Sequence, residues 1–389
     1  MSAHANPDIV GDGLVFLYDT DDGKSYKGEP TENIFLNPTF IGTAGTQTST
    51  VTDNWYFSGY TGASGFKFYN NSTSPIPLKF ANEGAVITTA ASPDNQNRRF
   101  YCDEVLEVGA TYAVSAWIYT TRTSGISIAH FEYGGATLNT GYFSSTSTHP
   151  NHAVGEWYYW EDTYTVGADY TSGLIGPVHT GSSDTIVGIQ RFQIEKKSHA
   201  TPFVNGTRSA TQGLIDRTGT STINISNASF DSNAQMTFDG TDDYLDCGDM
   251  GISSSKVTFA AWIKFSGSST EHIIDASGNT CHLAILSGNK PYFYNGSTYH
   301  TGADTITNGV WYYLTGVQSD TNDIYINGVL SNSINSNVNI SVSTVNIGRW
   351  QSGGRYFNGD IASARIYNRA LTAAEVLRNF NATKSRFGL

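Results

Sequence analysis

The sequence has few charged residues, and positive charge is the scarcer kind. Asp, Glu, Lys and Arg make up 14% of the 389 residues, and the formal net charge is −12. Nucleic acids and anionic membrane surfaces are recognised by basic patches, yet basic residues are adjacent only at Arg98-Arg99 and Lys196-Lys197. We therefore expect no nucleic acid and no membrane as a partner.

Cysteine and long apolar runs are scarce as well. The three cysteines, Cys102, Cys247 and Cys281, have no metal-type spacing and cannot all pair with one another, so we expect small buried side chains. The sequence contains no apolar run long enough to span a membrane. Its first residues lack the charged segment and the apolar segment of a secretory signal. We expect a protein that is made in the cytoplasm without such a signal.

Aromatic residues and glycine are abundant instead, with 23 Tyr, 20 Phe and 40 Gly. Short runs alternate apolar and polar residues, or are rich in β-branched and aromatic types, and Gly, Asn and Asp separate them. These are strand and turn signals, and their close spacing is typical of a sandwich or jelly roll. We predict an all-β protein of two jelly-roll β-sandwiches with a short C-terminal helix. The clearest runs are 236–246, 257–264, 311–317, 323–329, 345–350 and 356–371.

Taken in order, the runs from Met236 to Val376 resemble the laminin-G-like, concanavalin A-like jelly roll. The segments 11–26, 200–216 and 360–389 are similar to parts of structural proteins of tailed bacteriophages that carry this domain. In those proteins the first strand belongs to the same jelly roll as the C-terminal strands. The resemblance implies a discontinuous domain, in which residues 1–34 complete a sheet built from residues 208–389. The alternative is that residues 1–34 form an arm that docks on a partner.

Residues 35–207 resemble a family 4/9-type carbohydrate-binding module, which is also a β-sandwich. The resemblance begins at Asn37-Pro-Thr-Phe40 and continues through runs that start at Trp55, Tyr112, Gly155 and Ile189. The two predicted sandwiches share two tryptophan-containing runs, and we expect their tryptophans to be core residues. These are Trp117, Trp157, Trp262 and Trp311.

One helix is predicted near the C-terminus. Thr372-Ala-Ala-Glu375 fits a capping box, and Val376, Leu377 and Phe380 provide an apolar face. We expect this helix to pack on the edge of the sandwich.

The carboxylates do not form the pattern of a glycoside hydrolase. Such enzymes hold an acid and a base or nucleophile about 5–10 Å apart, and laminarinase-type members of the concanavalin A-like fold place them at alternating positions of one strand. From Arg208 onward the only glutamates are Glu271 and Glu375, and the helix cap explains Glu375. No Ser-His-Asp signature and no metal-type pair of histidines is apparent. We predict that the protein is not an enzyme.

Two turns are rich in aspartate, whose carboxylate oxygens are the ligands that Ca²⁺ prefers. Laminin-G-like and family 4/9-type domains often hold Ca²⁺ at a loop edge, so the resemblance implies a structural calcium ion. Aspartate beside glycine is also common in turns without a metal, and neither turn has the full EF-hand spacing. The candidate ligands are Asp19, Asp21 and Asp22 in one turn, and Asp239, Asp242 and Asp243 in the other.

Carbohydrate binding uses aromatic rings that stack on the apolar faces of sugars, together with polar side chains that read the hydroxyl groups. Aromatic residues near Gly- and Ser-rich segments are the candidates, although edge packing or a protein interface is the alternative for each. In the first predicted sandwich they are Trp55, Tyr56, Tyr60, Tyr133 and Tyr142. In the second they are Tyr292, Tyr294, Tyr299, Arg349, Trp350 and Arg355.

These features predict a non-enzymatic structural or adhesive protein on the surface of a tailed-phage virion, as a capsid decoration, tail or fibre component. Release by lysis would bring a protein without a secretory signal to the outside of the cell. The expected partners are other virion proteins and cell-surface or environmental polysaccharide, bound weakly and multivalently, and a homo-oligomer fits this role. One alternative is a decoration protein that binds only virion proteins. Another is the non-catalytic glycan-binding part of a polysaccharide-degrading system.

Overall fold

The computed structural model divides the chain into two compact units. One unit consists of residues 1–30 and 208–389, and the other of residues 31–207. The first unit is therefore discontinuous in sequence. The structure describes residues 8–34, 39–40, 50–51, 55–58, 66–90, 98–104, 106–121, 127–134, 137–143, 154–167, 172–179, 185–231, 235–276, 281–336, 338 and 340–389.

The discontinuous unit contains two antiparallel sheets. The eight-stranded sheet has, in spatial order, β16 (Ser229–Phe230), β17 (Met236–Asp239), β28 (Asn358–Tyr367), β19 (Val257–Phe265), β24 (Trp311–Gln318), β25 (Thr321–Ile326) and β26 (Val329–Asn335), with β1 (Leu14–Asp19) also paired to β28. The seven-stranded sheet has the order β15 (Asn224–Ser226), β18 (Tyr244–Ser254), β27 (Ile340–Ile347), β20 (Glu271–Ala276), β21 (Cys281–Leu286), β22 (Lys290–Tyr294) and β23 (Tyr299–Thr301).

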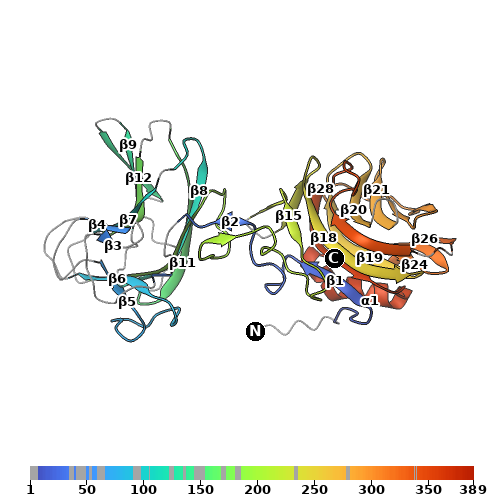
Figure 1. Ribbon diagram of the computed structural model, residues 1–389, viewed down its shortest axis with the longest axis horizontal. Helices are drawn as coiled ribbons and strands as arrows, with labels where there is room; N and C mark the ends of the chain where they lie inside the picture. The colour runs from blue at the N-terminus through green and yellow to red at the C-terminus, as the bar shows by residue number, and fades with distance from the viewer. Residues whose placement is uncertain are drawn as a thin grey trace. The chain divides into compact units, whose positions relative to one another are not determined.

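Strand β1 joins the first part of the chain to this unit. It pairs with β28 from Leu14 opposite Tyr367 to Asp19 opposite Ser363, and Figure 1 shows it in blue beside the C-terminal strands. Its alternating sequence turns Phe16 and Tyr18 into the core between the two sheets, where both side chains are fully buried.

Both faces of β19 are buried, each in a different apolar cluster. Every second residue, from Val257 to Phe265, faces the core between the sheets. The alternate residues Ala260 and Trp262 lie in a separate cluster on the outer face of the sheet. The helix α1 (Ala373–Thr383) and the 3-10 helix η1 (Lys384–Phe387) contribute aromatic residues to this cluster, so the C-terminal segment covers the outer face.

The capping box predicted for α1 is present in full. The Thr372 hydroxyl accepts the Glu375 amide, and the Glu375 carboxylate accepts the Thr372 amide. Arg369 donates to both carboxylate oxygens of Glu375, at 3.0 and 2.7 Å. The hydrogen bond from Arg369, with help from Thr372, lowers the pKa of Glu375 to about 2.

The buried face of α1 differs in one position from the prediction. Val376 is buried, but the side chain of Leu377 is 42% exposed. Asn379 is buried instead, where it accepts the backbone N–H of Val10 and donates to the Tyr367 hydroxyl. An amide there serves polar groups of the first segment and of β28, which an aliphatic face could not satisfy.

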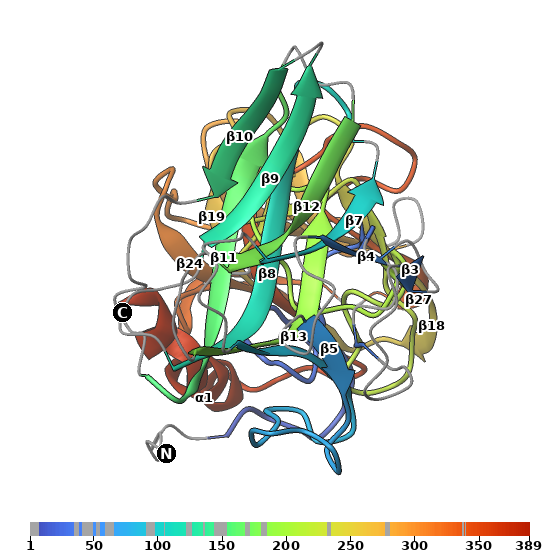
Figure 2. The same cartoon turned by 90° about the vertical axis from the view of Figure 1, so that its left-hand side faces the viewer.

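The second unit is also built from antiparallel sheets. Its six-stranded sheet has the order β10 (Thr137–Phe143), β9 (Ser127–Gly134), β12 (Ser172–His179), β7 (Arg98–Glu104), β4 (Trp55–Ser58) and β3 (Thr50–Val51), visible side by side in Figure 2. Its five-stranded sheet has the order β11 (Trp157–Thr165), β8 (Thr111–Thr120), β13 (Thr185–Glu195), β6 (Ala85–Ala90) and β5 (Phe66–Tyr69). A ladder of β2 (Thr31–Glu32) and β14 (Thr207–Arg208) joins the two points where the chain crosses between units.

The architecture confirms the predicted fold class. The described chain is nearly all-β, its strands form several sandwich sheets, and a short helix ends it. None of the helices in the described ranges is long and apolar enough to span a membrane. Cys247 and Cys281 are buried free thiols, as predicted, whereas the side chain of Cys102 lies outside the described residues.

The prediction of four core tryptophans is right for only one of them. Trp262 is fully buried, although it lies under α1 and η1 and not between the two sheets. Trp117, Trp157 and Trp311 are only half-buried. A tryptophan in the middle of an alternating strand can face either side of the sheet, so its presence there predicts burial less well than it predicts a strand.

Candidate functional site

The outer face of the seven-stranded sheet carries a group of aromatic residues. Phe293 of β22 packs into the core, so its neighbours Tyr292 and Tyr294 lie on the opposite face. Tyr294 is paired with Tyr299 of β23, and their rings stack with centroids 4.5 Å apart. Tyr299 is 61% exposed, so one side of this stacked pair is open to solvent.

Trp350 and Arg355 lie in the loop between β27 and β28 and extend this face. The Arg355 guanidinium is 4.8 Å from the centre of the Trp350 ring, within the range of a cation–π contact. Arg355 is exposed and Trp350 is half-buried. We refer to Tyr294, Tyr299, Trp350 and Arg355 as the aromatic surface.

Three titratable side chains lie beneath the aromatic surface. His272 and Asp275 of β20 and His282 of β21 are fully buried. The Nδ1 atom of His272 is 3.0 Å from Oδ1 of Asp275, and the Nδ1 atom of His282 is 3.5 Å from the same oxygen. We call these three residues the His–Asp–His cluster. It joins the parts of the surface, because the His282 ring lies 4.9 Å from that of Tyr294 and the His272 ring lies 6.4 Å from that of Trp350.

A β-bulge creates the cluster. In a regular strand, residues three positions apart face opposite sides, so His272 and Asp275 would be separated by the sheet. The pairing of β20 with β21 shifts between His272 and Ile274, and both Ile273 and Ile274 are buried. The extra residue turns His272 and Asp275 to the same face, where Asp275 pairs with His282 across the ladder.

Burial disfavours the protonated form of both imidazoles of the cluster. Desolvation lowers the pKa of His272 and outweighs the hydrogen bond to Asp275. Desolvation, with the charges of His272 and Arg355, lowers the pKa of His282 to about 2.

The polar atoms of the cluster are not equally satisfied. Asp275 accepts the backbone N–H of Gln351 through Oδ2, at 3.0 Å. The Nε2 atom of His272 lies 3.2 Å from the Tyr292 hydroxyl and 3.3 Å from Nη1 of Arg355. Neither ring nitrogen of His282 has a hydrogen-bond partner among the described residues. His282 is therefore a buried polar side chain that makes no hydrogen bond to the described residues, which is unusual in a folded protein.

The structure places the predicted sugar-contact residues of this unit in three different situations. Tyr294, Tyr299, Trp350 and Arg355 belong to the aromatic surface. Arg349 lies apart, with its guanidinium 3.3 Å from the centre of the Tyr244 ring and its Nε donating to Asn346. Tyr292 is fully buried, so its prediction as a sugar contact is wrong. Tyr292 instead supports His272 from below.

The His–Asp–His cluster was not predicted from the sequence. No metal-type pair of histidines is apparent there, yet His272 and His282 lie on neighbouring strands with ring centroids 4.3 Å apart. The only available signal was a His-x-x-Asp run in an apolar strand followed by a second histidine at the start of the next strand. Regular alternation argues against that signal, because the bulge is not evident in the sequence.

The candidates of the second unit fall largely outside the described side chains. The backbone places Trp55 and Tyr56 on β4, Tyr133 on β9 and Tyr142 on β10. Strands β7 and β12 separate β4 from β9 in the sheet, so these residues do not come from neighbouring strands as one group. Their side chains, and all of Tyr60, lie outside the described residues.

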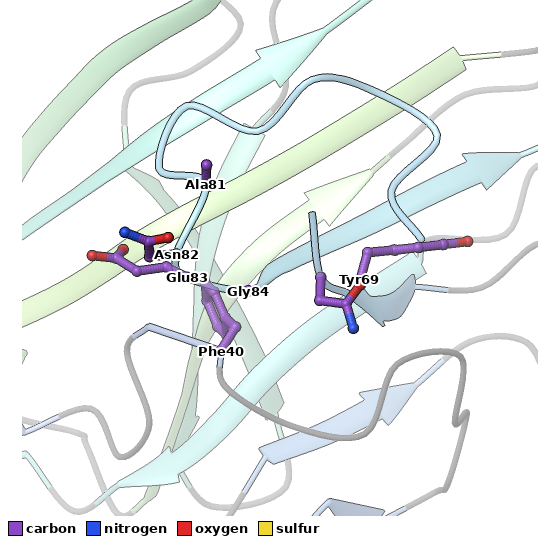
Figure 3. Close-up of a pocket in the computed structure, with 7 residues that line it drawn as sticks. Phe40, Tyr69, Ala81, Asn82, Glu83 and Gly84 are labelled. Carbon is purple, nitrogen blue, oxygen red and sulfur yellow. The ribbon is translucent and has the colours of Figure 1, made fainter. Parts of the chain in front are cut away.

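The second unit has a pocket of about 260 Å³ near β5 and β6 (Figure 3). Its base is tight, since a Cβ on Gly84 would lie 1.9 Å from the carbonyl oxygen of Phe40. The Glu83 carboxylate beside it is held by Arg191 at 2.7 Å. The volume is below the roughly 300–1,000 Å³ of typical small-molecule sites, and none of the predicted sugar-contact residues lines it. The lining residues are Phe40, Tyr69, Asn70, Ala81, Asn82, Glu83 and Gly84.

Arginines pair with the first aspartate turn. Asp19 and Asp21 face Arg386, and Asp22 pairs with Arg217 at 2.8 Å. Burial raises the pKa of Asp22, but the bonds from the Lys24 backbone and from Arg217 lower it overall. All three carboxylates therefore already have an arginine as a partner. Calcium binding by Asp19, Asp21 and Asp22 stays a prediction.

The second aspartate turn brings its three carboxylates together. Oxygen atoms of Asp239, Asp242 and Asp243 lie within 4.8 Å of one another. Asp243 accepts the Asp239 amide at 2.8 Å, and Asp239 accepts the Thr241 amide at 2.7 Å, so the carboxylates also stabilise the turn itself. Burial and then the charges of Asp239 and Asp242 raise the pKa of Asp243. Calcium binding here is likewise a prediction.

Comparison with known proteins finds a family match for part of this unit. Residues 239–377 match the model of the concanavalin A-like lectin/glucanases superfamily, Laminin_G_3. This segment has the concanavalin A-like lectin/glucanase fold. The laminin-G-like resemblance of the sequence is thereby confirmed for these residues. No curated protein matches the chain.

Solved structures with similarity to the chain include three kinds of protein. Domain 4 of AbnA, a GH43 extracellular arabinanase from Geobacillus stearothermophilus in complex with arabinotriose, is 18% identical with a TM-score of 0.34, over 43% of this chain and 91% of that one. The heptameric SAP-like pentraxin from Limulus polyphemus is 21% identical with a TM-score of 0.32, over 37% and 79%. The receptor-binding domain of botulinum neurotoxin C/D mosaic serotype is 13% identical with a TM-score of 0.36, over 43% and 48%.

Proposed function

We propose that this protein is a non-enzymatic glycan-binding protein and that the aromatic surface holds the sugar. The observation that carries the proposal is Tyr299, which is 61% exposed and yet stacked on Tyr294. A fixed, solvent-facing ring offers a flat apolar face for a pyranose ring without a large loss of side-chain entropy on binding. Arg355, whose guanidinium lies 4.8 Å from the centre of the Trp350 ring, adds several N–H donors to the aromatic surface, and these suit sugar hydroxyls.

The carboxylates near this surface support binding rather than hydrolysis. Glycosidases need two carboxyl groups that reach the scissile bond. Asp275 is fully buried under the surface, and Glu271 is buried where it accepts the backbone N–H of Asn358 and the hydroxyl of Ser269. Both carboxylates are therefore engaged by the fold and shielded from a polysaccharide.

We also propose that the protein displays this surface on a tailed-phage virion, with other virion proteins and polysaccharide as partners. The support is the resemblance of residues 11–26, 200–216 and 360–389 to phage structural proteins. Many copies on one particle would turn weak sugar contacts into avidity. Peptides of this protein in purified phage particles would support the assignment, whereas their absence from particles that infect normally would contradict it.

Binding of the purified chain to a polysaccharide panel and to bacterial cells tests the glycan-binding proposal. We expect Tyr299→Ala and Trp350→Ala each to weaken binding at least about tenfold, equivalent to about 1.4 kcal/mol. Leu330→Ala is the matched control, because Leu330 is 48% exposed on β26 of the other sheet. Unchanged affinity in the Tyr299 and Trp350 double variant would remove the aromatic surface from consideration.

A further inference from the structure

The His–Asp–His cluster has the composition of a metal site. Imidazole nitrogens and carboxylate oxygens are the ligands that Zn²⁺ takes along with cysteine thiolates, at about 2.0–2.2 Å. Two histidines and one aspartate supply three such atoms, and these lie within 4.8 Å of one another. All three side chains are fully buried, in contrast to the exposed acidic groups that are common at protein surfaces.

The distances within the cluster fit a common tetrahedral centre. With metal–ligand bonds of about 2.1 Å, neighbouring ligand atoms of a tetrahedron lie about 3.4 Å apart. Oδ1 of Asp275 lies 3.0 Å from Nδ1 of His272 and 3.5 Å from Nδ1 of His282. One carboxylate oxygen thus lies at metal-ligand spacing from both imidazoles.

His282 provides the independent observation that points to a ligand. Neither of its ring nitrogens has a hydrogen-bond partner among the described residues, although the side chain is fully buried. A buried polar atom without a hydrogen-bond partner destabilises a fold, so such atoms are rare in proteins. The 3.5 Å separation from Asp275 is too long for a good hydrogen bond but suits two ligands of one ion.

We propose that His272, Asp275 and His282 bind a divalent transition-metal ion, with Zn²⁺ as the expected class. The surrounding contacts match those that orient metal ligands. The Tyr292 hydroxyl lies 3.2 Å from Nε2 of His272, and the Gln351 amide donates to the second oxygen of Asp275 at 3.0 Å. These contacts fix both ligands with their other polar atoms turned toward the cluster.

The site is structural in character, because its three side chains are buried. A bound ion would join β20 and β21, and through Gln351 it would hold the loop that carries Trp350. The proposal goes beyond the glycan-binding function, since metal binding is measured without any sugar.

Arg355 provides a second test, because the direction in which its removal changes the metal affinity can be predicted. Its Nη1 atom is 3.3 Å from Nε2 of His272. A nearby guanidinium repels a divalent ion, so the ion must displace this exposed side chain toward solvent. Arg355→Ala should therefore bind the metal at least as tightly as the wild type.

The experiment uses tag-free full-length protein that has been dialysed against a chelator. Zn²⁺ titration by calorimetry and visible absorption of bound Co²⁺ measure stoichiometry and geometry, and Ca²⁺ is the control ion because it prefers six to eight oxygen ligands. We expect the wild type to bind one more Zn²⁺ than His282→Gln or Asp275→Asn, and to melt at a higher temperature with Zn²⁺ only when the cluster is intact. His300→Gln is the matched control, because His300 is a buried histidine outside the cluster whose Nε2 also has no hydrogen-bond partner in the described part of the chain.

A milder variant keeps the test valid if a ligand substitution prevents folding. Tyr292→Phe retains the shape of the ring and removes the hydroxyl that contacts His272 and Arg355. Loss of a contact that supports a metal ligand weakens metal binding about 10–100-fold. Equal Zn²⁺ stoichiometry and affinity in the wild type and Tyr292→Phe, together with weaker binding by Arg355→Ala, would overturn the proposal.

Discussion

The two outer faces of the discontinuous unit are both rich in aromatic residues, but they are completed in different ways. On the eight-stranded sheet, the Trp262 ring stacks on Phe387 with centroids 4.1 Å apart, and its Nε1 donates to Thr383 at 2.7 Å. The chain's own C-terminal segment therefore covers that face. On the seven-stranded sheet, Tyr299 faces solvent, and the ring nitrogens of His282 have no hydrogen-bond partner within the described ranges. An aromatic face that the chain covers is core, whereas one left open with polar atoms below it is suited to recognition.

The largest expected effect is a difference in the free energy of unfolding between a tryptophan variant of the covered face and one of the open face. Trp262→Ala removes a fully buried indole and its hydrogen bond, so we expect it to lower the free energy of unfolding by about 3–5 kcal/mol. Trp350→Ala removes a half-buried ring from the open face and should cost about 1 kcal/mol. Urea unfolding of both variants measures the difference. Equal losses would show that the open face is as much a part of the core as the covered one.

Removal of one hydroxyl group from each face gives a finer comparison. Tyr313→Phe removes the acceptor of Arg365, which is buried at 1% exposure, so we expect a loss of about 1–3 kcal/mol. Tyr292→Phe removes the contact to a neutral imidazole and should cost about 0.5–1.5 kcal/mol in metal-free protein. Chemical denaturation with chelator present is the measurement. A larger loss for Tyr292→Phe would contradict the view that the open face contributes less to folding.

The covered face was largely predictable from the sequence. Alternation in β19, a capping box before α1 and the apolar residues that follow it all point to a helix packed on a sandwich. The prediction failed at Leu377 and Asn379, because the helix buries an amide to serve Val10 and Tyr367. Those two partners come from distant parts of the chain, and helical periodicity carries no information about them.

The open face was predictable only in part. Exposed aromatic residues beside Gly-rich turns indicated Tyr299 and Trp350, and the structure brings both around one buried cluster. The cluster itself depends on the bulge in β20, since one extra residue reverses the face to which Asp275 belongs. Tyr292 was predicted to contact sugar but is fully buried. The sequence does not reveal that neighbouring residues of the same face cover it.

A smaller effect concerns the helix that covers the first face. Glu375→Gln removes the ion pair with Arg369, and we expect a loss of about 1 kcal/mol or less at neutral pH. The folded pKa of Glu375 is lowered to about 2, so its contribution is complete above the ordinary pKa of about 4.5 and disappears as the pH falls toward 2. The wild type should therefore lose more stability than Glu375→Gln between pH 5 and pH 2. Parallel pH profiles of the two proteins would contradict the role of this pair.

The smallest expected effect concerns calcium at the aspartate turn of Asp239, Asp242 and Asp243. Burial and then the charges of Asp239 and Asp242 raise the pKa of Asp243, and a bound Ca²⁺ would relieve the repulsion among the three carboxylates. At a free concentration equal to its Kd, the ion would stabilise the fold by about 0.4 kcal/mol. Thermal melts with Ca²⁺ and with EDTA measure this shift, and Asp242→Asn should abolish it while Asp21→Asn should not, because Asp21 faces Arg386 at 3.5 Å. Identical melting temperatures in Ca²⁺ and EDTA would contradict calcium binding, and the three carboxylates would then serve only to stabilise the turn. The His–Asp–His cluster would then be the stronger metal candidate in the described part of this unit.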